Sequence, residues 1–420
     1  MDWTKGFYTR TWVDWSEWTI MDFSLSEKDQ KLFERAKEFT KEHITPRAME
    51  LEKRNDFPKD VVQKAYEAGL MNLHIPTEAG GPGLSLFSET LVSEATGYGG
   101  AGIATSIMCN NLAFAPLVIG ATIEQLKEYV EPLITGKDAK FGAFCLTERK
   151  AGSDAAAVAT RAVRDGDEYV INGLKCFITN GPQASMFTVF ASTQPELKHK
   201  GLSVFMVPKT KGVKIGHIEN KLGQLNSIQS EVIFEDVRVP KNALVGKEGE
   251  GFRIAMMTLD KTRAGIAAIA TGVAQRALDE AAKFANVRHQ FGQPIGRFQG
   301  ISFMLADMGA RTAASRHLTR YAAWLADHGH DNSKDSAFAK FFASDAAMQN
   351  AIDAVQIMGG YGYVSEYPAE KLMRDAKLLQ IYEGTNQVQR VVASGRILKE
   401  SVNLDTGFNV KYDGQDAPIP

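Results

Sequence analysis

The run Ile381-Tyr382-Glu383-Gly384-Thr385-Asn386-Gln387 sets one acid among apolar residues. Leu378 and Leu379 precede the run, so Glu383 has apolar neighbours on its N-terminal side. Burial raises the pKa of a carboxyl group, as a base that removes a proton from carbon requires. A lone glutamate is more often a surface residue, so the run alone leaves both interpretations open.

Four earlier stretches contain residue types that suit a flat, phosphate-bearing ligand. In 144–154 small and hydroxyl-bearing residues follow a predicted strand, and in 176–181 an aromatic residue stands two places before a threonine. In 288–292 an arginine suits a phosphate, and in 355–360 two glycines can admit a flat ligand. Taken alone, each stretch is better explained by an ordinary turn, strand end or helix end.

Outward from these stretches, helical and β patterns alternate along the chain. Residues 22–140 are predicted to be helical, because Ser24 with Glu27 and Thr122 with Gln125 have capping-box spacing. Pro58 suits the first position of another helix in this block. Residues 246–400 return to long helical periods with alanine-rich runs. The sequence therefore predicts a mainly α protein with a middle β domain.

The middle block, residues 141–245, contains short runs rich in aromatic and β-branched residues. Asp165-Gly166 is a hairpin signal, so we expect a small antiparallel β domain. The expected strands are 141–146, 168–171, 187–191, 202–207 and 231–234.

Composition and missing motifs exclude several classes of protein. A length of 420 residues favours two or three domains, and a net charge of −2 without a basic block argues against a nucleic-acid partner. The three cysteines have no metal or redox spacing, so buried free thiols in a reducing compartment are expected. The zinc-type His-Glu-x-x-His and the Gly-x-Ser-x-Gly elbow are absent. Gly246, Gly249 and Gly251 lack dinucleotide-fingerprint spacing, so we expect a turn there.

The apolar runs and the two ends of the chain indicate where in the cell the protein is located. No apolar stretch reaches the roughly 18 residues of a membrane span, and the acids near the N-terminus argue against a mitochondrial presequence. We expect a bacterial cytoplasm, with the mitochondrial matrix as the alternative. Residues 1–21 form an extension with four of the five tryptophans, which either packs on a surface such as another subunit or has no role. Residues 401–420 are predicted to be a C-terminal tail.

In their order along the chain, the five stretches resemble the acyl-CoA dehydrogenase family, most of all its short- and medium-chain members. The resemblance covers about residues 22–400 and is most specific in 146–154, 361–374 and 380–390. It implies an N-terminal helical domain, a middle antiparallel β domain and a C-terminal four-helix domain. It also implies non-covalent FAD and a homotetramer.

The resemblance further implies which residues contact the flavin. Residues expected at the flavin are Phe144, Leu146, Thr147, Gly152, Ser153, Phe177 and Thr179, and Thr385 and Gln387 are also expected to touch FAD. Residues expected at the FAD of a neighbouring subunit are Arg288, Phe291 and Gln299, with Gln356 and Gly360 at its diphosphate.

By the same resemblance, Glu383 removes the proton α to the thioester carbonyl while a hydride passes from the β carbon to flavin N5. The electrons then pass to an electron-transfer flavoprotein. Asp260 and Arg263 are expected to hold the CoA portion, since residues i and i+3 share one helix face. Some relatives carry the base at the position of Thr262, which cannot act as a carboxylate. The expected substrate-binding residues are Ser153, Asp260, Arg263, Tyr382, Gly384 and Met108.

Three departures from the family pattern leave questions open. Arg149-Lys150 stands where the family usually has Pro-Gly, and it either points into water or binds a CoA phosphate, a substrate carboxylate or a partner. Phe177 stands where tryptophan is commoner, which keeps the ring and loses an N–H donor. Met108 and Cys109 suggest an adaptable apolar pocket floor, so straight, branched, cyclic and aryl acyl groups all stay open. An acyl-CoA oxidase, an enoyl-CoA reductase and a non-catalytic binding protein are the alternatives.

Overall fold

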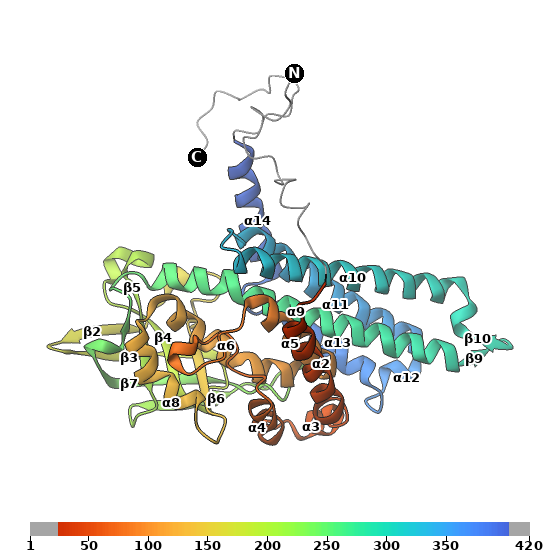
Figure 1. Cartoon of the computed structure of the whole chain (residues 1–420), viewed down its shortest axis with the longest axis horizontal. Coiled ribbons are helices and arrows are strands. Elements are labelled where there is room, and N and C mark those ends of the chain that lie inside the picture. The colour runs from red at the N-terminus through yellow and green to blue at the C-terminus, as the bar shows by residue number, and fades with distance from the viewer. Residues whose placement is uncertain (1–23, 403–420) are drawn as a thin grey trace, which may run out of the picture.

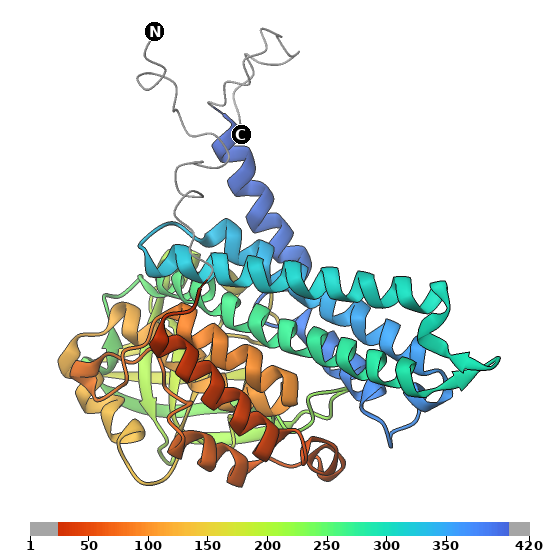
Figure 2. The same ribbon diagram turned by 45° about the vertical axis from the view of Figure 1, so that its right-hand side comes forward.

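The computed structural model describes residues 24–402, so the predicted extension 1–21 and nearly all of the predicted tail 401–420 lie outside the described residues. The large sheet occupies one end of the molecule, long helices run from it to the other end, where β9 and β10 lie, and the first helices lie across the middle (Figure 1). The view turned by 45° shows these first helices in front of the long ones (Figure 2). The predicted order of helices, sheet and helices is confirmed.

The helical part before the sheet begins differently from its prediction. Helix α2 has Ser26 as its N-cap, whose side chain accepts a hydrogen bond from the amide of Asp29, so the predicted pairing of Ser24 with Glu27 is wrong by two residues. At α7 the capping box of Thr122 and Gln125 is confirmed. The elements are α2 (Glu27–Phe39), η1 (Thr40–Ile44), α3 (Ala48–Arg54), α4 (Lys59–Glu67), η2 (Thr77–Ala79), α5 (Leu86–Gly99), α6 (Ala101–Gly120), α7 (Ile123–Tyr129) and α8 (Glu131–Ile134).

Helix α6 is long and apolar enough, by length and composition, to cross a membrane. The sequence prediction had found no such segment, because no uninterrupted apolar run reaches about 18 residues. Buried residues make up 83% of its most apolar window. Pro116 lies inside this helix, and α5, α9 and the first strand pack around it. Its apolar composition is therefore explained by packing inside the protein.

The strands of the described chain form one large sheet and a two-stranded ribbon. The large sheet has the order β6-β7-β3-β2-β4-β5-β8, with β1 paired to β4. Its strands are β1 (Phe141–Cys145), β2 (Arg161–Asp165), β3 (Glu168–Thr179), β4 (Ala184–Ser192), β5 (Leu202–Pro208), β6 (Val213–Ile218), β7 (Gln229–Pro240) and β8 (Leu244–Val245). The ribbon pairs β9 (His289–Gln290) with β10 (Gln293–Pro294).

The sheet corrects the purely antiparallel prediction at one point. β1 and β2 both pair with β4 in parallel, because the chain makes the β2–β3 hairpin before β4 returns beside β1. The predicted hairpin at Asp165-Gly166 is confirmed, and Gly166 adopts a φ of +61°. β2 and β6 were not predicted, since β2 is charged and mostly exposed and β6 is an edge strand interrupted by Gly216.

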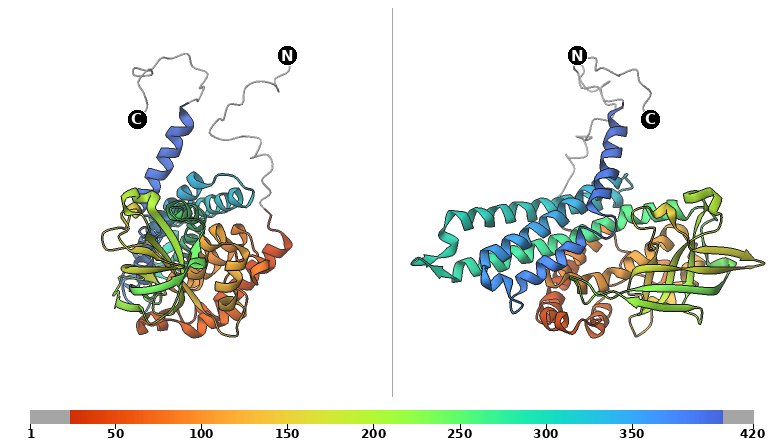
Figure 3. Two further views of the ribbon diagram at one scale, coloured as in Figure 1. Left: turned by 90° about the vertical axis from the view of Figure 1, so that its left-hand side faces the viewer. Right: turned by 180° about the vertical axis from the view of Figure 1, so that it is seen from behind.

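The helices after the sheet share an alanine-rich core. Buried alanines of α9 and α11 form one cluster with residues of α6, α10 and α13. The end-on and rear views show α14 leaving this bundle (Figure 3). The elements are α9 (Gly251–Val287), η6 (Ile295–Arg297), α10 (Gln299–Asp327), α11 (Ser333–Met358), α12 (Gly360–Tyr363), α13 (Pro368–Leu379) and α14 (Asn386–Ser401).

Two glycines bring α5 into close contact with α9. A Cβ at Gly272 would lie 2.3 Å from the carbonyl oxygen of Glu94, and one at Gly97 would lie 2.6 Å from that of Ile269. Such distances leave no room for a side chain. The crossing fixes α5 against the helix that carries Thr262.

Candidate active site

Glu383 lies in the loop between α13 and α14, in a left-handed backbone conformation. Its φ is +51°, and that of Gly384 is +86°. A non-glycine residue in this region costs on the order of 1–3 kcal/mol, so the surroundings must hold the loop. A Cβ at Gly384 would lie 2.5 Å from Nε2 of Gln389, so a side chain there would displace the Gln389 amide.

Two side chains hold the carbonyl groups of this loop. Lys340 on α11 is fully buried, and its Nζ donates to the carbonyl oxygen of Gly384 at 2.8 Å and to Oδ1 of Asn386 at 3.0 Å. Nε2 of Gln389 on α14 donates to the carbonyl oxygen of Glu383 at 3.0 Å. These bonds fix the backbone that carries the Glu383 carboxyl group.

The Glu383 carboxyl group accepts a hydrogen bond from the hydroxyl of Thr262 on α9, with 2.8 Å between Oγ1 and Oε2. Burial raises the pKa of Glu383, while the Thr262 bond and the charges of Lys340 and Arg263 oppose the rise. Burial also lowers the pKa of Lys340 to about 7, against the attraction of Glu383. A carboxyl group in this setting is suited to accept a proton from carbon.

Tyr382 connects the loop to α6. Its hydroxyl lies 3.4 Å from Oγ1 of Thr105, which donates to Oε1 of Gln224 at 3.0 Å. Met108 and Cys109 follow one turn further along α6 and are buried. The residues predicted as the pocket floor therefore lie on the helix that Tyr382 touches.

The first group of expected flavin residues lies where β1 and β3 end. The amide of Cys176 on β3 donates to the carbonyl oxygen of Thr147 at 3.0 Å, which places the loop after β1 beside β3. Sγ of Cys109 lies 3.5 Å from the carbonyl oxygen of Thr179, which joins this region to α6. Phe177 has a φ of +56° and is 62% exposed, so its ring is free to stack on a ligand ring.

The other members of this group lie on the same two segments or at the start of α14. Phe144 belongs to β1, Leu146 and Thr147 follow it, and Gly152 and Ser153 are exposed in the loop beyond. The side chain of Thr385 caps α14 by accepting from the amide of Val388 at 3.2 Å, and Gln387 lies in the first turn of that helix.

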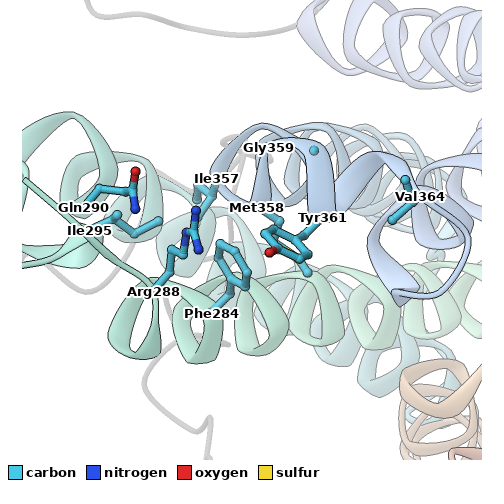
Figure 4. Close-up of a pocket in the computed structure, with 10 residues that line it drawn as sticks. Phe284, Arg288, Gln290, Ile295, Ile357, Met358, Gly359, Tyr361 and Val364 are labelled. Atoms are coloured by element: carbon cyan, nitrogen blue, oxygen red, sulfur yellow. The ribbon is translucent and has the colours of Figure 1, made fainter.

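The second group lies at the opposite end of the long helices. Arg288 directly follows α9. This helix has 37 residues and is roughly 55 Å long at 1.5 Å per residue. Arg288 and Gly360 line a cavity of about 530 Å³, in which the guanidinium of Arg288 lies over the ring of Tyr361 (Figure 4). Phe291, in the turn between β9 and β10, is 94% exposed. Figure 1 places this ribbon far from the sheet, so one chain does not bring both groups together.

Asp260 and Arg263, expected to hold CoA, contact each other. Nη1 of Arg263 lies 2.6 Å from Oδ1 of Asp260, which also accepts from the hydroxyl of Ser333 at 3.1 Å. Arg263 is buried, and its charge acts on Glu383. In this arrangement Arg263 contributes to the electrostatics of the Glu383 site.

Arg149 also has a partner within the chain. Its Nε and Nη2 donate to Oε1 of Glu231 at 2.9 and 2.5 Å, although most of the side chain is exposed. The ion pair with Glu231 was not among the predicted roles of Arg149-Lys150, which were exposure to water or binding of a CoA phosphate, a substrate carboxylate or a partner. Lys150 is exposed.

Two buried lysines at the site were missed from the sequence. Besides Lys340, Lys175 on β3 is fully buried and donates to the carbonyl oxygen of Leu146 and to Glu148 at 3.0 and 2.8 Å, which holds the loop after β1. For Lys340 a signal was present, because Ala337 and Ala343 lie one turn away on the same helix face. A lysine within an alanine-rich face is a candidate for a buried charge.

Comparison with known families gives matches along most of the chain. Three family models match consecutive parts: the acyl-CoA dehydrogenase N-terminal domain at residues 26–137, the middle domain at 143–237 and the C-terminal domain at 249–398.

Individual relatives agree with this match. The acyl-CoA dehydrogenase of Bacillus subtilis (strain 168) is 43% identical, covering 86% of this chain and 96% of the relative. The acryloyl-CoA reductase (NADH) of Anaerotignum propionicum is 42% identical, covering 90% and 96%. A chain in a structure of the electron transferring flavoprotein of Acidaminococcus fermentans superposes with a TM-score of 0.88 at 44% identity, covering 90% of this chain and all of that one.

Proposed function

Because this chain belongs to the acyl-CoA dehydrogenase family, we propose that it oxidises an acyl-CoA thioester to the 2-enoyl-CoA with Glu383 as the base. The chain is an oxidoreductase that acts on CH–CH groups, and FAD is the cofactor of this family. The observation that carries the proposal is the Glu383 carboxyl group, which is held on a constrained loop with a raised pKa.

The residues present fit a flavin. Phe177 offers an exposed ring beside the loop after β1, and the cavity at Arg288 offers a cation next to backbone without side chains at Gly359 and Gly360. A Cβ at either glycine would meet nothing within 4 Å, so a ligand can approach the backbone there.

The distance between the two groups bears on assembly. Since they lie at opposite ends of the long helices, a flavin held by both needs a second copy of the chain. This supports the proposal of a homotetramer in which Arg288, Phe291, Gln299, Gln356 and Gly360 serve a neighbouring subunit's FAD.

FAD, when bound, supplies the acceptor for the hydride that leaves the β carbon. Glu383 takes the α proton, and the electron pair of that C–H bond becomes the new double bond as the β hydride departs. The Thr262 hydrogen bond occupies Oε2 of Glu383, so we assign the proton transfer to Oε1. Lys340 and Gln389 keep the carboxyl group in place during the step.

We propose an electron-transfer flavoprotein as the acceptor that reoxidises the enzyme, supported by the superposed chain from a structure of such a protein. The resemblance to an acryloyl-CoA reductase favours enoyl-CoA reduction as the second candidate. Rapid oxygen consumption without another acceptor would instead identify an oxidase. A bacterial cytoplasm remains the proposed location.

The test is a panel of straight, branched, cyclic and aryl acyl-CoAs with an artificial electron acceptor. At least one should bleach the flavin, and Glu383→Gln should lower that turnover by at least about 1,000-fold while FAD stays bound. Glu366→Gln, an exposed glutamate before α13, is the matched control and should retain turnover. Unchanged turnover in Glu383→Gln would remove Glu383 from its role. If no acyl-CoA bleaches the flavin, a non-catalytic binding protein is the better hypothesis.

A further inference from the structure

The loop between β6 and β7 enters the interior of the molecule and is wedged between α6 and α13. Gln224 in this loop is fully buried and has a φ of +49°. A Cβ at Gly223 would lie 2.4 Å from the carbonyl oxygen of Arg374 on α13, and one at Gly102 on α6 would lie 3.0 Å from Cα of Gln224. A non-glycine residue in the left-handed region costs free energy, so the contacts of Gln224 must hold it there.

Gln224 holds α13 through both its backbone and its side chain. Its amide donates to Oδ1 of Asp375, and its Nε2 donates to the carbonyl oxygen of Asp375 at 3.1 Å. Asp375 is fully buried, and its carboxylate is paired with Lys371 one turn earlier on α13. Since α13 ends at Leu379, shortly before Glu383, these bonds fix the helix that leads to the base.

The same side chain acts on the residue directly before Glu383. Because Nε2 of Gln224 is bonded to a carbonyl group, Oε1 is the atom that faces Thr105, whose hydroxyl donates to it at 3.0 Å. The proton of Thr105 is then used, so its Oγ1 accepts from the hydroxyl of Tyr382, which lies 3.4 Å away. Gln224 therefore contacts the segment that carries the base on α13 and, through Thr105, at Tyr382.

In the other direction the loop leads to a residue expected at the flavin. The carbonyl oxygen of Gln224 accepts from the amide of Ser227 at 2.9 Å. Gln229 begins β7, and its Nε2 donates to Oγ of Ser227 at 3.0 Å and to Oγ1 of Thr179 at 3.1 Å. Thr179 ends β3 and is one of the residues expected to contact the isoalloxazine. A short polar path therefore joins Thr179 to Gln224.

The proposed oxidation removes hydrogens from two adjacent carbons, and their two acceptors are held by different parts of the chain. Glu383 lies between helices of the C-terminal part, whereas Thr179 belongs to the sheet. On the premise of that reaction, we propose that Gln224 is a positioning residue that sets the distance between Glu383 and the flavin-binding face of the sheet. Gln224 carries no charge, so its loss displaces the base without changing the charge beside it.

The experiment measures amide hydrogen exchange and flavin reduction in FAD-loaded Gln224→Met. Exchange in residues 380–386 should become about tenfold faster, because the segment loses two of its supports. The saturating rate of flavin reduction per bound FAD, with the acyl-CoA that bleaches the wild type fastest, should fall about 100-fold. KM should stay within about threefold, and the acidic limb of kcat/KM should stay in place. Thr105→Val breaks only the contact to Tyr382, so both effects should be smaller.

The double variant Gln224→Met/Thr105→Val should be no slower than Gln224→Met alone, since the two residues share one contact. Gln125→Met is the matched control. The side chain of Gln125 on α7 also joins a helix to the β domain, by donating to the carbonyl oxygens of Asn242 and Leu244 at 2.7 and 2.8 Å. Exchange in 380–386 and the rate of flavin reduction should stay unchanged in this control.

An unchanged rate of flavin reduction in Gln224→Met would overturn the positioning role and leave the dehydrogenation standing, whether or not exchange is faster. A slower rate with unchanged exchange in 380–386, or with a displaced acidic limb, would overturn it as well. If Gln224→Met does not fold, Thr105→Val decides by the same two measurements. If no acyl-CoA reduces the flavin of the wild type, the dehydrogenation is overturned, and the exchange measurement alone decides whether Gln224 holds the loop.

Discussion

Glu383 and Glu89 are two buried carboxyl groups, of which the charge of Glu383 acts on Glu89, and their neighbours differ in charge. The Glu383 carboxyl group accepts a hydrogen bond from the hydroxyl of Thr262, and the charges of Lys340 and Arg263 act on it. Glu89 faces an amide and a neutral imidazole. Burial raises the pKa of both, but only Glu383 has cations that favour its ionised form. Burial alone therefore does not identify a base, whereas the charged partners distinguish Glu383 from Glu89.

The backbone conformation also differs between Glu89 and Glu383. Glu89 lies in the first turn of α5, where regular helical hydrogen bonds support it. Glu383 lies on a left-handed loop that relies on Lys340 and Gln389. A position that costs free energy is retained where orientation matters, so the loop contacts should affect catalysis more than the helix contacts do.

The largest expected effect in this comparison comes from Lys340→Met. Without Nζ the carbonyl of Gly384 keeps only the longer bond from Gln389 at 3.3 Å, and Oδ1 of Asn386 keeps only the bond from Ser344 at 3.1 Å, so the carboxyl group of Glu383 should move. We expect turnover to fall by about 100- to 1,000-fold at every pH, since a misplacement of about 1 Å can cost about 100-fold. Loss of the cation also raises the pKa of Glu383, so the acidic limb of the kcat/KM profile should move to higher pH.

The control for this variant is Lys334→Met on the same helix, which removes an ion pair with Glu400 far from the loop. It should leave the profile in place. FAD content and melting temperature of both proteins show whether each is folded. A folded Lys340→Met protein with unchanged turnover would remove Lys340 from its positioning role.

A smaller effect, on stability, is expected from Glu89→Gln. The folded pKa of about 7 lies above the ordinary 4.5, so the folded state favours protonated Glu89. The free energy of unfolding of the wild type should therefore fall, through this group, as pH rises from 4.5 to 7, by up to about 3 kcal/mol. The glutamine variant lacks this loss, so its advantage should grow by that amount between pH 5 and pH 8.

Urea unfolding of the FAD-loaded proteins at the two pH values measures this difference, with Glu366→Gln as the exposed control. An advantage that is constant with pH would show that Glu89 titrates at its ordinary pKa. In that case burial is relieved by another group, and the contrast with Glu383 fails.

The sequence predicted features that depend on neighbouring residues. The capping box of Thr122 and Gln125 and the hairpin at Asp165-Gly166 are local, and both are confirmed. The start of α2 was displaced because Ser24 and Ser26 are both able to cap, and the choice depends on packing. The three-part order of the family was predicted because the motifs lie in a fixed order.

What could not be predicted depends on residues distant in sequence. The parallel pairing of β1 with β4 is decided by where the intervening hairpin goes. Lys340 meets Gly384 from 44 residues away, and Glu89 meets Asn111 from the next helix. Whether a charge in a helix faces water or a buried partner is settled by the crossing of helices. The predicted roles of the flavin and substrate residues remain predictions.

The smallest effect is expected from Thr262→Val, which keeps the shape of the side chain and removes the hydrogen bond to Glu383. That bond favours the ionised carboxylate, so its loss raises the pKa of Glu383 further. The acidic limb of kcat/KM should move upward by about one pH unit, with about a tenfold loss below the limb and little change above it. Thr271→Val on the same helix is the control, because that buried hydroxyl bonds only the carbonyl of Ala267. A limb that stays in place or moves to lower pH would mean that Thr262 does not tune Glu383, and the cations alone would then distinguish it from Glu89.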